Sequence, residues 1–185
     1  MASILQVEQI QGPTSGSNAN TITIPSGQTL DISNSTMSGL SSAEMPAGSV
    51  IQVITYNETD TDSWGISTTS TSFVSTGKSV TITPRSTSSK IVLMANFNAN
   101  GNASGDGLVF KFYRNSSAIG SNHGQIWYTN GATNFHGAQN LLYTDEPSST
   151  SATTYTLYYK SNSGGQCRIA QDWQSINLVA MEIAG

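Results

Sequence analysis

The sequence predicts an all-β protein, and in particular an antiparallel β-sandwich of jelly-roll-like type. Apolar runs recur about every ten residues with turn-forming residues between them, which is the pattern of a sandwich. Polarity comes from 29 Ser, 22 Thr and 15 Asn among the 185 residues. Only 10% of the residues are charged, against roughly 25% in an average domain. Threonine suits strands, serine and asparagine suit turns, and few lysines and glutamates leave few helix formers.

Residues 1–46 are predicted to form an extended arm of short strands that ends in a linker. Its two strand-like pieces, 21–24 and 29–32, are too short to bury a core of their own. Spaced apolar residues are nevertheless unusual for a disordered tail, so we expect the arm to order on another surface. The residues predicted to anchor it are Leu5, Val7, Ile10, Ile22, Ile24, Leu30 and Ile32.

Residues 47–185 are predicted to form the sandwich. The expected strands cover residues 50–56, 67–76, 79–83, 91–95, 108–114, 118–119, 138–144, 153–160, 166–170 and 175–184, and 67–76 is expected at a sheet edge. Pro84 ends one strand and residues 85–89 form a polar turn into the next. Residues 57–63 are expected to form an acidic loop, and residues 122–137 an irregular, aromatic region.

Three of these strands, 50–56, 91–95 and 175–184, are apolar on both faces. Such a strand must be covered on both sides. The second sheet supplies one cover, and either a further layer of this chain or a neighbouring subunit supplies the other. We expect the run 175–184 to lie in the middle of a sheet.

The irregular region contains the best candidates for a contact surface. They are His123, Trp127, Tyr128, Phe135 and His136, which suit carbohydrate stacking, a protein interface or simple packing under a loop. The two histidines lack metal-site spacing, although three copies around a threefold axis could chelate a metal. A second aromatic group, Tyr155, Tyr158, Tyr159 and Trp173, is expected in the core or at a subunit interface.

No catalytic constellation is visible, so we predict a protein that is not an enzyme and needs no cofactor. The carboxylates of Glu58, Asp60 and Asp62 could supply oxygen ligands to a hard cation, although a solvated acidic loop explains them as well. Cys167 lies in a strand and is expected to act as a small buried hydrophobe. Asp145 and Glu146 are adjacent on a strand end, where their side chains point in opposite directions.

The bulk composition excludes several classes of protein. The net charge is −4 and the pI is about 4.9, and the seven basic residues are scattered, so no nucleic-acid footprint is present. A single cysteine excludes a disulfide within the chain. The N-terminus has neither a basic nor an apolar signal region, and no apolar run is long enough to span a membrane.

Several motifs resemble structural proteins of bacteriophage virions, notably those of phages that infect cyanobacteria and other marine bacteria. In the arm, the motifs are Leu5, Val7, Ile10 and Gly12, followed by Gly27, Thr29, Leu30 and Asp31. In the sandwich, they are the runs 48–52, 82–91 and 178–184.

The resemblance implies a homotrimer in the virion, made in the host cytoplasm without a signal peptide. It would serve as a capsid-decorating cement protein or a short tail fibre, with residues 1–46 bound to other capsid or tail proteins. The alternative is a receptor-binding fibre or spike that recognises a host-surface glycan. Neither nucleic acid nor membrane is an expected partner.

Overall fold

The computed structural model describes residues 14–16, 22–29, 45–59, 65–102, 107–127, 135–170 and 175–185. The chain divides into two units, Met1–Gly39 and Leu40–Gly185. Within the first unit, Ile22 and Ile24 are exposed, and the amide of Gln28 donates to the carbonyl of Pro25 in a turn. The other predicted anchor residues, Leu5, Val7, Ile10, Leu30 and Ile32, lie outside the described residues.

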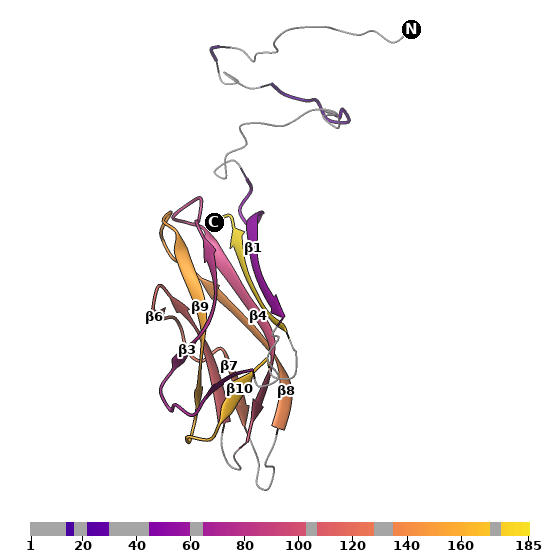
Figure 1. The fold of residues 1–185 in the computed structure, drawn as a ribbon. Helices are drawn as coiled ribbons and strands as arrows, with labels where there is room; N and C mark the ends of the chain where they lie inside the picture. The colour runs from indigo at the N-terminus through magenta and orange to yellow at the C-terminus, as the bar shows by residue number, and fades with distance from the viewer. Residues whose placement is uncertain are drawn as a thin grey trace. The chain divides into compact units, whose positions relative to one another are not determined.

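In the second unit, the described residues form eleven strands in two antiparallel sheets and no helix, so the all-β prediction is confirmed. Sheet A has the order β1–β11–β4–β10–β2. Strands β11 and β10 follow each other along one edge of β4, and β8 pairs with the opposite edge of β4. Its strands are β1 (Val50–Thr59), β2 (Ile66–Thr68), β4 (Lys90–Gly101), β8 (Phe135–Asp145), β10 (Cys167–Ile169) and β11 (Ser175–Ile183). Figure 1 shows β11, in yellow, between β1 and β4. The run 175–184 therefore lies inside a sheet, as predicted.

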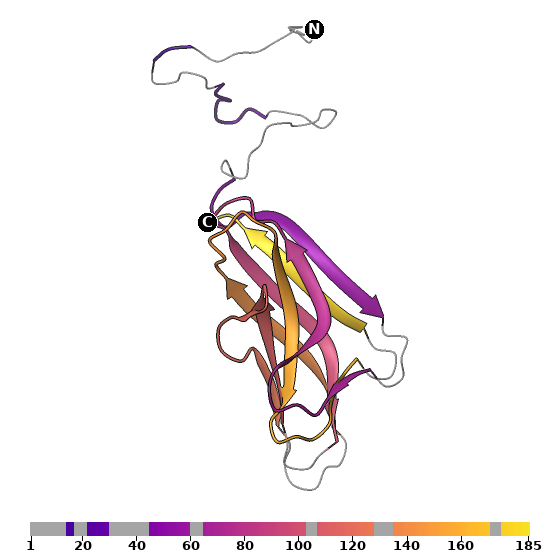
Figure 2. The same cartoon turned by 60° about the vertical axis from the view of Figure 1, so that its left-hand side comes forward.

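Sheet B has the order β3–β9–β5–β6, and β7 pairs with β5. Its strands are β3 (Val74–Ile82), β5 (Gly107–Arg114), β6 (Ser117–Ala118), β7 (Gly124–Trp127) and β9 (Thr153–Ser161). The two sheets pack face to face (Figure 2). The described part of the chain contains no helix long and apolar enough to cross a membrane.

Strict alternation of side chains places the core between the sheets. In β9 and β11 every second residue is buried, as the period of two requires. Phe97 of sheet A meets Phe110 of sheet B edge to face, with ring centroids 5.0 Å apart. Cys167 is fully buried in the same core, as expected for a small hydrophobe.

Two buried carboxylates fasten the sandwich. Asp145 of sheet A accepts hydrogen bonds from Arg114 (Nη1 to Oδ2, 3.0 Å) and from the Tyr155 hydroxyl (2.6 Å), both of sheet B. Glu182 on β11 accepts bonds from the Arg85 amide and the Ser89 hydroxyl, each at 2.6 Å. The first group joins the two sheets, and the second holds the loop before β4.

Three details of the predicted strands were wrong. The expected edge strand 67–76 is divided between β2 in sheet A and β3 in sheet B, because the chain crosses from one sheet to the other at residues 69–73. The acidic loop begins later than residue 57, since β1 continues to Thr59 in register with β11. The region 122–137 is not wholly irregular, because β7 pairs with β5 and β8 begins at Phe135.

Candidate subunit interface

The outer face of sheet A, on the side away from sheet B, presents an uncharged surface that spans four strands. Four strands, β1, β11, β4 and β8, present side chains there in three rows at matched register. The first row is Val53, Met181, Val92 and Thr144; the second is Thr55, Val179, Met94 and Leu142; the third is Asn57, Asn177, Asn96 and Asn140. None of these twelve residues is charged.

The first two rows are mainly apolar and accessible in the single chain. Leu142 is 68% exposed and Val53 is 46% exposed, while Val92, Met94, Val179 and Met181 are half-buried. Val50, 50% exposed, extends this surface toward the start of β1. Isolated apolar residues on a surface are ordinary, but a contiguous group of this kind marks an interaction site.

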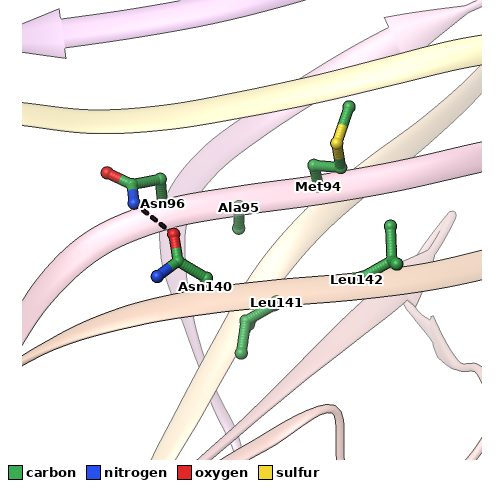
Figure 3. A pocket seen from close by; sticks show the side chains of 6 residues that line it. All are labelled: Met94, Ala95, Asn96, Asn140, Leu141 and Leu142. Carbon is green, nitrogen blue, oxygen red and sulfur yellow. Dashed lines mark hydrogen bonds between the residues drawn. The ribbon is translucent and has the colours of Figure 1, made fainter.

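The third row is a ladder of four asparagines, one from each strand. The Asn96 Nδ2 group donates to Asn140 Oδ1 at 2.5 Å, and Figure 3 shows this pair beside Met94 and Leu142. A hollow of about 290 Å³ lies here, lined by Met94, Ala95, Asn96, Asn140, Leu141 and Leu142. An amide side chain both donates and accepts hydrogen bonds, so an asparagine row can pair with another copy of itself.

The sequence predicted the apolar rows but not the ladder. The double apolarity of 91–95 and 175–184 is real: Leu93 and Ala180 face the core, while Met94 and Val179 face outward. The asparagines went unnoticed because this residue type is common in the turns of the chain. A signal was present in the sequence, because Asn96 directly follows one apolar run inside a strand and Asn177 directly precedes another.

His123, predicted at a contact surface, is half-buried. Its ring lies against those of Tyr143 and Phe112, at centroid distances of 4.2 and 5.5 Å. Its Nδ1 accepts the Phe112 amide at 2.9 Å, and its buried Nε2 has no partner among the described residues. Burial, and secondarily the charge of Lys111, lowers the pKa of His123 to about 4, so the ring is neutral at physiological pH.

The other predicted contact residues lie at the start of β8, at the end of β7 or outside the described residues. His136 is exposed, with its Nε2 3.3 Å from the Asn100 amide nitrogen. It is seven residues from Tyr143 along β8, about 23 Å, so the two histidines of one chain do not share a site. Trp127 ends β7 and Phe135 begins β8, whereas Tyr128 and Trp173 are outside the described residues.

Of the three carboxylates considered as ligands for a hard cation, only that of Glu58 belongs to the described residues. The Glu58 carboxylate accepts hydrogen bonds from the Lys78 ammonium and the Tyr56 hydroxyl, and these bonds lower its pKa. Asp60 and Asp62 lie outside the described residues. Among the residues that are described, no three His, Cys, Asp or Glu side chains gather as metal ligands would.

Asp145 is buried and Glu146 exposed, so these neighbours diverge as predicted.

The structure thus defines a β-sandwich with an uncharged sheet face suited to self-association. No known protein-family model matches the sequence, and no curated protein matches it either.

Among solved structures, the fold is similar to VP2 of infectious bursal disease virus. The VP2 subviral particle gives 16% identity and a TM-score of 0.42, covering 94% of this chain and 41% of VP2. A mutant VP2 in T=1 particles gives 13% identity and a TM-score of 0.40, over 74% and 37%. VP2 of the Gx strain gives 15% identity and a TM-score of 0.37, over 74% and 38%. This chain therefore spans about two fifths of the VP2 chains, at low identity and low TM-score.

Proposed function

We propose that the protein is a non-enzymatic structural component of a virus particle and assembles as a homotrimer through the outer face of sheet A. The observation that carries the proposal is this face: it is four strands wide, it is uncharged in its three rows, and Leu142 and Val53 are exposed in its two mainly apolar rows. Sheet B covers the inner face of the same strands. A neighbouring subunit on the outer face would supply the second cover that doubly apolar strands require.

The size of the face sets what it can support. Four strands spaced about 4.8 Å apart, over some seven residues of about 3.4 Å each, cover roughly 400–500 Å². Two such faces would bury about 800–1,000 Å², which is below the roughly 1,200–2,000 Å² of stable specific interfaces. In a homotrimer the three faces would meet around a threefold axis, and each subunit would contact two neighbours.

The position in the virion rests on the sequence resemblance to phage structural proteins. Residues 1–46 would bind the particle, and the sandwich, of jelly-roll-like type, would project from a capsid as a cement protein or from a tail as a short fibre. Deleting residues 1–41 should abolish incorporation into particles while the sandwich stays folded. Unchanged incorporation would contradict the anchor.

Two measurements test the proposal directly. Light scattering of the full chain during size-exclusion chromatography should give three times the chain mass of 19.5 kDa. A stable 19.5 kDa species at micromolar concentration would refute the trimer. Imaging of labelled protein on particles distinguishes the locations, because hundreds of copies indicate a capsid and a few copies at one vertex indicate a tail.

The alternative role, recognition of a host glycan through the region of His123, Trp127 and His136, stays a second proposal. The exposed position of His136 favours it. Trp127→Ala should then reduce adsorption to host cells without changing particle stability, and unaltered adsorption would remove this alternative.

A further inference from the structure

A cluster of aromatic and basic side chains lies on the opposite side of the sandwich, on the outer face of sheet B. Phe73 immediately precedes β3, Lys111 and Tyr113 belong to β5, and Tyr158 and Lys160 belong to β9. We call these five residues the Phe73 cluster. Lys111 pairs with Tyr158 across the two strands, and all five side chains are half-buried.

The three rings form one contiguous aromatic group. Tyr113 and Tyr158 stack with their centroids 3.8 Å apart and their planes 17° from parallel. Phe73 lies beside Tyr113, with centroids 6.2 Å apart. Tyrosine and phenylalanine faces bind apolar C–H surfaces, while the tyrosine hydroxyls remain available for hydrogen bonds.

The ammonium groups of both lysines lie over the Phe73 ring. The Lys111 ammonium lies 5.4 Å from the centre of the Phe73 ring, and that of Lys160 lies 5.5 Å from it. One aromatic ring therefore attracts two cations, which repel each other in turn.

Three of the described cations form ion pairs with carboxylates. Lys78 pairs with Glu58, Lys90 with Glu146, and Arg114 with Asp145. No described carboxylate pairs with Lys111 or Lys160. The chain has a net charge of −4, so the two lysines make a local excess of positive charge beside the aromatic rings. An anion placed between the two ammonium groups would relieve their repulsion.

We infer that the Phe73 cluster binds an acidic polysaccharide. Sugar rings present C–H faces to aromatic side chains, and their carboxylates, spaced along the polymer, reach the two lysines as charge-assisted partners. Single-stranded nucleic acid also stacks and is anionic, but its binding sites use a groove with many cations along the backbone. Two lysines on an acidic protein suit the sparser charge of a carboxylated glycan. This inference does not depend on the sheet A interface.

The test uses the full chain and oligogalacturonate as the probe, with a maltooligosaccharide of equal length as the neutral comparison. Isothermal titration calorimetry at low salt should show binding of the first and none of the second. Added NaCl should weaken the binding, since partly exposed charges are screened. Lys111→Gln with Lys160→Gln should weaken it by about tenfold or more, because two charge-assisted contacts are lost.

The matched control is Arg85→Gln with Lys90→Gln, which removes the same charge from exposed positions elsewhere. This variant should bind within about twofold of the wild type, as long-range charge effects are small. Absence of oligogalacturonate binding by the wild type overturns the inference, as does equal binding by the Lys111/Lys160 variant. Tighter binding of single-stranded oligothymidylate through the same two lysines would also overturn it, in favour of nucleic acid. If the double variant does not fold, the salt dependence and the neutral probe decide the matter on the wild type.

Discussion

Replacing Leu142 by aspartate should break the assembly without unfolding the subunit. Leu142 is 68% exposed in the single chain, so the substitution costs the isolated sandwich little. Burying a whole leucine side chain is worth about 1.5–3 kcal/mol, and burying the exposed share of Leu142 is therefore worth about 1–2 kcal/mol per interface. A ring of three has three interfaces, so leucine truncation alone costs about 3–6 kcal/mol, or two to four orders of magnitude in the association constant.

The aspartate adds the cost of placing three unpaired carboxylates in contact with Met94 and Val179. We therefore expect Leu142→Asp to be monomeric at micromolar concentration, and Leu142→Ala to dissociate on dilution. Sedimentation velocity across a concentration series measures both. Thr87→Asp, an exposed change in the loop before β4, is the control and should remain trimeric. Circular dichroism verifies folding. If Leu142→Asp keeps the wild-type mass while folded, the face of sheet A is not the interface.

Two further substitutions and one pH titration address the buried polar groups and the histidine. Burial alone would raise the pKa of Glu182, but hydrogen bonds from Ser89, from Gln52 and from backbone amides lower it below the ordinary 4.5. The contribution of the Glu182 carboxylate to stability is therefore complete above about pH 4.5 and is lost as the pH falls through the folded-state pKa. Glu182→Gln should lower the free energy of unfolding, measured in urea, by about 3 kcal/mol at pH 7 and by less in acid. Tyr155→Phe removes the hydroxyl that donates to Asp145 and should cost about 1–3 kcal/mol, measured in the same way. The pKa of His123 falls from 6.5 unfolded to about 4 folded, so its stabilising effect should be full above pH 6.5 and decline as the pH falls toward 4, as NMR titration of the ring can verify. Equal pH profiles for wild type and Glu182→Gln, an unchanged stability of Tyr155→Phe, or a His123 titration near pH 6.5 would contradict the respective expectation.

The strands were predictable because the alternation of apolar and polar residues indicates which side chains face the core. Leu157 and Tyr159 alternate with half-buried neighbours, and the run 175–184 was apolar enough to indicate a central strand. The pairing of strands was not predictable, because it depends on contacts between residues distant in sequence. The chain crosses between sheets in the polar stretch before β3, where residue types alone do not show the change of partner.

The two surfaces proposed as sites of contact were predicted only in part. Double apolarity correctly indicated an outer face that includes Met94 and Val179, because that signal is local to each strand. The Phe73 cluster is assembled from three separate elements, so no window of sequence contains it. His123 was predicted at a contact surface because it is aromatic and polar in a loop, and its packing against Tyr143 and its bond from the Phe112 amide are contacts that the local sequence does not indicate.

The place of β11 has a consequence for biosynthesis. It separates β1 from β4, yet it follows every other described strand along the chain. Gln52 and Glu182, which are hydrogen-bonded in the finished sheet, are 130 residues apart. While the ribosome is still making the preceding strands, β1 has no partner and one edge of β4 is open, and such distant pairings form slowly. The apolar face is therefore completed only after β11 has emerged and paired with β1 and β4, so association through this face must follow the synthesis of β11.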